Sequence, residues 1–185
     1  MYEELAVAIE KRIKRYHKDF SLPLMAEFWE EVLTRSLEDI GLKPEWDNGR
    51  SHKVGEDIFE ESIGRISCKS GSIVKGSVTL NGSRTTRYKT LEEKLEFLSS
   101  SHDDVYFLLA KDKNDIKEKN YKYKVLVFPS STIKVDTLKW EETKGGWKGT
   151  GDFSARISRS MSAQLWTTLP LEKVEHILEI DGNPS

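Results

Sequence analysis

The sequence predicts an α/β fold, in which helices flank a mixed central β-sheet that continues into a C-terminal β-hairpin. Near the N-terminus, apolar residues repeat at three- and four-residue spacing, which is typical of amphipathic helices. Two continuous apolar runs, 105–110 and 123–128, have the length of central strands covered on both faces. Residues 153–160 alternate between apolar and polar side chains, which indicates a strand with one buried face.

The size and composition fit one domain with its own hydrophobic core, because the chain has 185 residues of which 37% are hydrophobic. We expect a single domain, 1–185, built from an N-terminal helix (1–20), a core (21–130) and a C-terminal part with a hairpin and a helix (131–185). The net charge of −2 excludes the domain-wide basic excess that is usual in nucleic-acid-binding proteins. Any such surface must therefore be local.

The cysteine count and the hydropathy pattern bear on localisation. Cys68 is the only cysteine, so a disulfide framework and a cysteine-based zinc site are excluded and a reducing compartment is favoured. No apolar run approaches the roughly 20 residues of a membrane-spanning helix. The N-terminus lacks the charge order of a secretory signal. We expect a soluble cytoplasmic protein without a membrane partner.

Two helices are predicted at the start of the chain. The first spans 2–18, and its basic residues are expected to form a solvated face. The second spans about 23–40, with Pro23 in its first turn and Gly41 at its end. It carries the strongest helical periodicity in the sequence.

Short strands and a third helix are predicted next. The strands are 58–59, 65–68 and 73–80, the first two joined by a turn around 61–64 and the third ending in a turn at Asn81-Gly82. Thr90 and Glu93 have the spacing of a capping box, which predicts a helix over about 90–99.

The C-terminal third is predicted to contain a hairpin and a closing helix. Strands 137–142 and 153–160 flank a glycine-rich connection, 144–151, and the final helix covers 170–180. The connection lacks the Gly-x-x-x-x-Gly-Lys-Ser/Thr spacing of a nucleotide-triphosphate loop. A hairpin that clamps DNA with Lys148 is one interpretation, and a long turn is the other.

Asp57 and Lys69 are the central candidates for chemistry. Hydrolysis of a phosphodiester needs a divalent metal held by hard oxygen ligands such as a carboxylate. Because side chains alternate along a strand, Ser67 and Lys69 share one face while Ile66 and Cys68 turn to the core. The same residues also fit an exposed cross-strand ion pair that contributes little to stability.

The spacing Asp57-(x9)-Ser67-x-Lys69 resembles the signature of the PD-(D/E)XK nuclease superfamily, and the helices and strands around it follow that superfamily's order over residues 25–166. The sequences Gly55-Glu56-Asp57 and Cys68-Lys69-Ser70, with a tryptophan-bearing hairpin near the C-terminus, are similar to small dimeric type II restriction endonucleases. The resemblance implies a restriction-endonuclease-like fold, Mg²⁺ as cofactor, Asp57 as metal ligand and Lys69 as the residue that orients or deprotonates the attacking water.

Ser67 departs from this family, which usually has Asp or Glu at that position. Some members carry the acid on a neighbouring helix, which makes Glu92 the favoured second metal ligand and Glu30 its nearest rival. Glu93 and Glu96 are weaker candidates, since Glu93 already has a capping role. A register shifted by one residue would instead select Glu56 or Glu60.

Two arginine-bearing stretches are the candidate DNA contacts. Arg84 and Arg87 precede a helix N-terminus, where cations and backbone N–H groups can meet phosphate. Arg156 and Gln164 are types that pair with base edges, and a two-stranded ribbon fits the major groove. The predicted DNA-binding residues are Arg84, Arg87, Lys148, Arg156, Ser158, Arg159, Ser160 and Gln164.

Taken with the resemblance, these features predict a Mg²⁺-dependent, sequence-specific endonuclease of double-stranded DNA. A homodimer is expected, since two-fold symmetry is the simplest way to cut both strands, with helix 2–18 as the contact. A repair or junction-resolving nuclease and a non-catalytic DNA-binding module derived from a nuclease are the alternatives.

Overall fold

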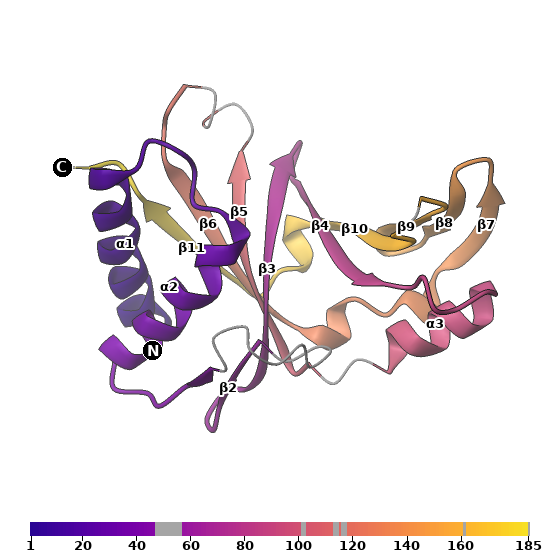
Figure 1. The fold of residues 1–185 in the computed structure, drawn as a ribbon, viewed down its shortest axis with the longest axis horizontal. Helices are drawn as coiled ribbons and strands as arrows, with labels where there is room; N and C mark the ends of the chain where they lie inside the picture. The colour runs from indigo at the N-terminus through magenta and orange to yellow at the C-terminus, as the bar shows by residue number, and fades with distance from the viewer. Residues whose placement is uncertain (47–56, 101–102, 113–114, 116–117, 161, 185) are drawn as a thin grey trace.

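The computed structural model describes residues 1–46, 57–100, 103–112, 115, 118–160 and 162–184. Within these residues the fold is mixed α/β, with one large mixed sheet of 11 strands and a few helices. Nine strands follow the order β11-β6-β5-β3-β4-β10-β9-β8-β7, and β1 and β2 attach beside β3. The sheet splays into two arms that meet at β3 and β4 (Figure 1). Within the part of the chain described, no helix has the length and apolar character needed to cross a membrane.

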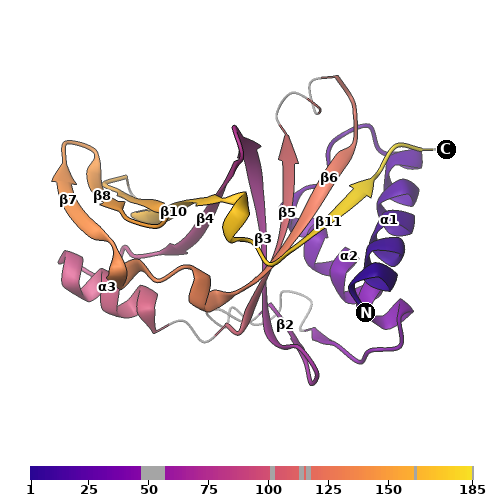
Figure 2. The same cartoon turned by 180° about the vertical axis from the view of Figure 1, so that it is seen from behind.

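Two helices, α1 (Tyr2–Asp19) and α2 (Ala26–Asp39), cover the first arm on one side (Figures 1 and 2). Trp29 of α2 is fully buried, and its indole N–H donates to the Phe107 carbonyl at 3.0 Å. Gly41, at a φ of +87°, ends α2, and the amide of Leu42 returns to the Leu37 carbonyl at 3.1 Å. Both helices were predicted, but α2 begins after Met25, so Pro23 precedes the helix.

The first arm consists of β11 (His176–Asp181), β6 (Lys122–Pro129), β5 (Val105–Asp112) and β3 (Gly64–Val74). β3 and β5 are parallel, and their connection contains α3 (Leu91–Ser99). The predicted capping box is present: Thr90 accepts from the Glu93 amide, and the Glu93 carboxylate accepts from the Thr90 amide. Two short strands, β1 (Glu45–Trp46) and β2 (Ile58–Glu60), pair beside the N-terminal end of β3.

The second arm is an antiparallel sheet with α3 on one side (Figure 1). Its strands are β4 (Ser77–Arg84), β7 (Lys139–Thr143), β8 (Gly146–Thr150), β9 (Ser154–Ser158) and β10 (Gln164–Pro170). Three 3₁₀ turns complete the described elements: η1 (Ser130–Thr132), η2 (Val135–Thr137) and η3 (Leu171–Lys173).

Two hydrophobic cores lie on opposite faces of the sheet. Phe107 and Leu109 of β5 contribute to the core under α1 and α2, whereas Leu108 and Ala110 contribute to the core under α3. This alternation follows from the two-residue period of a strand. We call the two sides the α2 face and the α3 face.

Three predictions about the elements were wrong. The turn after β3 lies at Lys75-Gly76, both with positive φ, and Asn81-Gly82 continues β4. The glycine-rich connection contains β8. The expected helix over 170–180 is instead the end of β10, η3 and β11, so the C-terminal part contains strands where a helix was predicted.

Candidate active site in a notch of strand β3

One edge of β3 changes partner halfway along the strand. β2 pairs with β3 up to Ile66, and β4 pairs with it only from Gly71 onward. Among the described strands, none pairs with residues 67–70 on this edge. The resulting notch lies where the arms diverge; Ser67 and Cys68 are buried there, and Lys69 and Ser70 are partly exposed.

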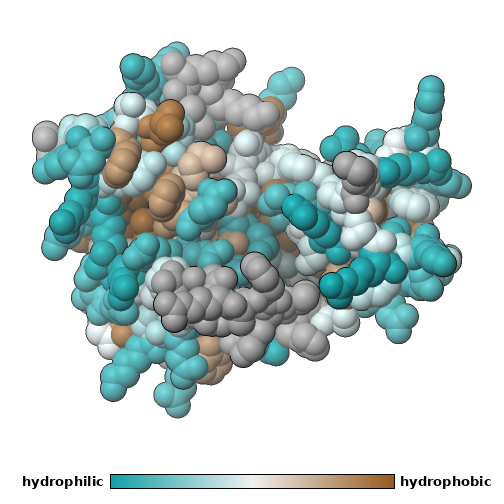
Figure 3. All heavy atoms as spheres, viewed as in Figure 1, coloured by the Kyte–Doolittle hydropathy of each residue, from teal (hydrophilic) through white to brown (hydrophobic). Residues whose placement is uncertain are grey.

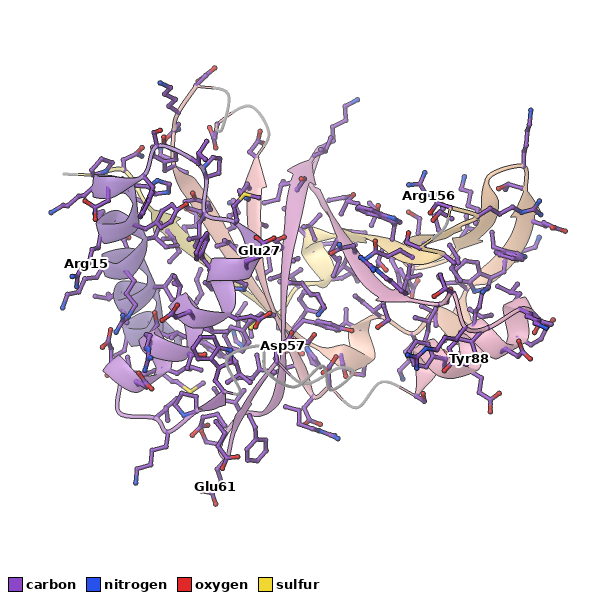
Figure 4. All side chains as sticks on the ribbon, viewed as in Figure 1. Arg15, Glu27, Asp57, Glu61, Tyr88 and Arg156 are labelled. Carbon is purple, nitrogen blue, oxygen red and sulfur yellow. The ribbon has the colours of Figure 1, made fainter. Side chains whose placement is uncertain are left out.

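Asp57 occupies this notch. Its amide donates to the Ile66 carbonyl at 3.1 Å, which extends the β2–β3 pairing by one residue. Its Oδ2 accepts from the Cys68 amide at 2.6 Å, so the carboxylate takes the place of a missing strand partner. The Asp57 side chain is 24% exposed, and Figure 4 shows it at the centre of the molecule, between the two arms.

Ser67 and Lys69 point to the same side of β3, as predicted. The Ser67 hydroxyl and the Lys69 ammonium each lie 3.4 Å from Asp57 Oδ2. Cys68 points the other way, into the core under α2, where burial raises the pKa of its thiol well above the ordinary value and the Asp57 and Glu30 carboxylates raise it further. The thiol is therefore held in its neutral form.

Glu30 of α2 is the second carboxylate at the notch. Burial raises the pKa of Glu30, and repulsion from the Asp57 carboxylate adds to this shift. The nearby Trp46 indole and the Lys69 ammonium act in the opposite direction. The two carboxylates are thus electrostatically coupled beside one lysine, an arrangement that a bound divalent cation would stabilise.

The other candidate acids lie elsewhere. Glu92 is exposed in the first turn of α3, on the second arm, and among the described residues it is Glu30 that interacts with Asp57. Glu93 caps α3, and Glu60 is buried and accepts from the Ser62 amide at 2.8 Å. Gly55 and Glu56 lie outside the described residues, so the alternative register at Glu56 has no structural counterpart here.

The donor set suits a hard cation that retains water. Among the described residues, no three His, Cys, Asp or Glu side chains form a ready-made metal cluster. Mg²⁺ commonly takes one or two carboxylates and keeps several waters, which Asp57 and Glu30 can satisfy. Within the described part of the chain, Asp57 Oδ1 has no hydrogen-bond partner and is available as a ligand atom.

A cavity of about 530 Å³ adjoins the notch on the α3 face, and Ser67 and Lys69 form part of its wall. Two further charged residues on that wall come from the segment around η2, Lys134 and Asp136. The cavity is rich in hydroxyl groups, supplied by Ser67, Ser83, Ser99, Ser100, Ser130 and Ser131. It can therefore accept a polar ligand beside the catalytic candidates.

Arg84 and Arg87 are both exposed in the segment that leads into α3. Two buried side chains fix this segment. Thr85 donates through its hydroxyl to the Ala163 carbonyl at 2.6 Å, and Lys94 donates to the Thr85 carbonyl at 2.8 Å and to the Tyr88 carbonyl. Figure 4 shows Tyr88 beside α3, on the same lower side of the molecule as Asp57.

The remaining predicted DNA contacts divide into two groups. Arg159 pairs with Glu142 and lies against the Trp147 ring, Ser158 bonds to Ser160, and the Gln164 amide donates to the Gly82 carbonyl at 3.1 Å. These polar side chains already make contacts within the protein. Lys148 and Arg156 are exposed neighbours in the β8–β9 register, on the α2 face of the sheet.

Sequence reasoning missed three residues at these sites. The burial of Lys94, whose side chain is 4% exposed, was not anticipated from the sequence. The proximity of Trp46 to Glu30 could not be predicted, because no sequence pattern links the two segments that carry these residues. The outward position of Trp166, whose side chain is 37% exposed, was also missed, although its alternation with Leu165 and Thr167 in β10 is a signal that could have placed it outward.

Comparisons with known proteins give no assignment: no protein-family model matches this chain, and no curated protein does either. The functional interpretation therefore depends on the geometry of the notch and its surroundings.

Proposed function

We propose that the protein is a Mg²⁺-dependent endonuclease that hydrolyses phosphodiester bonds in double-stranded DNA, with a restriction-endonuclease-like fold. The observation that carries this proposal is the convergence of Asp57, Glu30 and Lys69 at the notch of β3. Two carboxylates and an ammonium at one partly exposed point are the groups that metal-assisted phosphate hydrolysis requires.

Each residue has a role that follows from its position. Asp57 and Glu30 would hold Mg²⁺, which when bound supplies Lewis acidity and a water of lowered pKa. Lys69 lies 3.4 Å from Asp57 Oδ2, where its ammonium can orient the attacking water and stabilise charge on the phosphate. Ser67, fully buried, holds the Asp57 carboxylate through its hydroxyl and leaves the position of the usual acid neutral.

The segment of the second arm that leads into α3 offers exposed candidates for phosphate contacts. Arg84 and Arg87 are exposed beside the N-terminus of α3, where backbone N–H groups and the helix dipole favour anions. Lys94 and Thr85 fix the backbone between the two arginines. We infer that this segment positions the duplex relative to Lys69.

The proposal includes a homodimer, because two copies related by a two-fold axis would place one notch on each DNA strand. Exposed apolar side chains lie at the junction of α1 and α2, namely Phe20, Leu22, Met25 and Phe28. Figure 3 shows hydrophobic side chains gathered over these helices. A surface of this kind is typical of association sites.

Digestion of a mixture of plasmids with Mg²⁺, followed by sequencing of the ends, tests the activity. We expect defined duplex cleavage that falls at least about 100-fold in Lys69→Met and in Asp57→Asn. Lys173→Met and Asp152→Asn change exposed residues away from the notch and serve as matched controls. Full Mg²⁺-dependent activity in either notch variant would contradict the proposal, and cleavage restricted to branched substrates would favour a junction-resolving nuclease.

A further inference from the structure

The second arm carries an exposed row of side chains on its α2 face. Opposite residues in the register run from Glu141 to Lys148, Arg156, Trp166 and Asn81 across β7, β8, β9, β10 and β4. Lys148 and Arg156 are exposed, and the Trp166 side chain is 37% exposed. We call these five residues the outer row.

A second row beside it consists almost entirely of hydroxyl side chains. Its members, in register across five strands, are Thr150, Ser154, Thr168, Thr79 and Ser72. Thr79 and Thr168 bond to each other through their hydroxyls at 3.0 Å. Among the described residues of these two rows, the face is therefore polar around one large aromatic side chain, Trp166.

The outer row and the catalytic candidates lie on opposite faces of the sheet. Ala155, Ile157 and Leu165, which alternate with Arg156 and Trp166, belong to the core under α3. Lys69 shares the wall of the α3-face cavity with Leu165. Figure 4 shows Arg156 on the side of the second arm away from α3. A duplex held at Lys69 does not reach the outer row along a straight path.

The outer row is also too wide to enter a groove of duplex DNA and contact the base edges there. Five adjacent strands at about 4.8 Å spacing span roughly 19 Å, whereas the major groove of B-DNA is about 12 Å wide. Arg156 therefore lies within a wide sheet and not on an isolated two-stranded ribbon, because β9 is flanked on both sides by paired strands.

The chemistry of the face fits an unpaired strand. Lys148 and Arg156 supply positive charge, and the one acid of the row, Glu141, lies 3.8 Å from Lys139. An exposed tryptophan beside cations on a sheet face is the combination on which unpaired bases stack while the backbone meets basic groups. The hydroxyls of the second row add donors and acceptors that do not select one base.

We propose that the outer row binds single-stranded nucleic acid, as a second surface separate from the notch. Trp166 stacks on a base, and Lys148 and Arg156 neutralise neighbouring phosphates. The inference goes beyond the proposed nuclease activity, because it concerns a different face of the sheet and involves no hydrolysis.

Fluorescence anisotropy with a labelled oligodeoxythymidylate of about 16 nucleotides tests the surface directly. The measurement uses the full chain with Lys69→Met in EDTA, so binding is recorded without cleavage. We expect Trp166→Thr to weaken binding about tenfold. Arg156→Gln is expected to weaken binding and to reduce the slope of log K against the logarithm of the salt concentration by about 0.7. Ile177→Thr, at a side chain that is 39% exposed on β11, is the matched control and should leave binding unchanged.

The outcomes separate the two proposals. Equal affinity of the parent and of both outer-row variants, or absence of binding to the single strand, would overturn the outer-row proposal. A hairpin duplex that binds with the same affinity and the same sensitivity to Trp166→Thr would also overturn it. Failure of plasmid cleavage alone contradicts only the nuclease proposal, since the anisotropy measurement does not depend on it. Far-ultraviolet circular dichroism confirms that each variant is folded.

Discussion

Asp57 Oδ2 accepts hydrogen bonds from three groups of β3: the Cys68 amide, the Ser67 hydroxyl and the Lys69 ammonium. This anchors one carboxylate oxygen and fixes the direction of the other. Glu30 approaches from α2, so the two acids belong to elements that the fold must bring together. In the proposed site, a bound cation would relieve this repulsion and so couple cation binding to folding.

Glu30→Gln tests this coupling. The folded state raises the pKa of Glu30 above the usual value of about 4.3, so the unfolded chain loses this proton first as the pH rises. The contribution of the protonated Glu30 carboxyl to folding stability is complete at pH values below its pKa in the unfolded chain. It is lost as the pH rises through the higher pKa of Glu30 in the folded protein. Without divalent cations, we therefore expect thermal melts in which Glu30→Gln matches the parent at acidic pH and exceeds it at neutral pH.

Calorimetric titration of the same variant with Mg²⁺ or Mn²⁺ completes the test. Glu30→Gln should weaken the affinity at least about tenfold, whereas Glu92→Gln, the matched change at the acid favoured by the sequence, should leave it unchanged. The reverse ranking of the two variants would assign the second ligand to Glu92 and contradict the geometry proposed for the notch.

How far the site could be predicted from the sequence depends on the range of each interaction. The shared face of Ser67 and Lys69 follows from alternation within one strand, which is a local property. The choice between Glu30 and Glu92 could not be made in this way. It depends on how α2 lies over β3, and a carboxylate on a helix has no pattern that reports this.

At the scale of elements, non-local strand pairing overrides local helical spacing. A helix was predicted over 170–180, and Leu171, Val174 and Leu178 do have helical spacing, yet residues 176–181 pair with β6 over six positions. The glycine-rich segment was predicted as a loop for a similar reason. Gly149 lets strand β8 pack closely against Leu138, because a Cβ at this position would lie 2.9 Å from a Leu138 side-chain atom. This glycine is therefore part of a strand and does not indicate a loop.

Gly71 marks the start of the pairing between β3 and β4, and Gly71→Ala tests its importance. A Cβ at this position would lie 2.8 Å from the Thr79 carbonyl oxygen and 3.0 Å from a Val78 methyl group. Because the nearest atom is backbone, β4 must shift, and we expect a loss of about 1–3 kcal/mol in the free energy of unfolding. Urea denaturation measures this loss.

Gly145→Ala is the control, since nothing lies within 4 Å of a Cβ at Gly145. Equal stability of the two alanine variants would show that β4 adapts without strain. It would also show that a fixed divergence of β3 and β4 does not create the notch.

For the whole molecule, the two arms divide the surface by face. The α3 face carries the cavity with Lys69, and the α2 face of the second arm carries the outer row. On the first arm the α2 face is covered by α1 and α2, whose outward side chains include a group of exposed apolar residues. The helices therefore provide the surface that we assign to the second copy.

Charges around this apolar group favour contact between identical copies. Lys11, Lys14, Arg15 and Lys18 make α1 basic on one flank, and Glu27 and Glu31 make α2 acidic on the other. A two-fold axis through the group would place the basic flank of one copy against the acidic flank of the other. Tyr16 and Phe28, whose ring centroids are 6.1 Å apart, lie between the two flanks.

Phe28→Glu tests the homodimer, because it introduces a charge into this apolar group at a side chain that is already 50% exposed. We expect light scattering coupled to size-exclusion chromatography to give a dimer for the parent and a monomer for the variant. On supercoiled plasmid, the parent should form linear product directly, whereas the variant should accumulate the nicked circle, since each copy carries one notch. Val74→Glu, at a 49% exposed side chain at the end of β3, controls for the added charge. A monomeric parent that makes linear product directly would overturn the dimer.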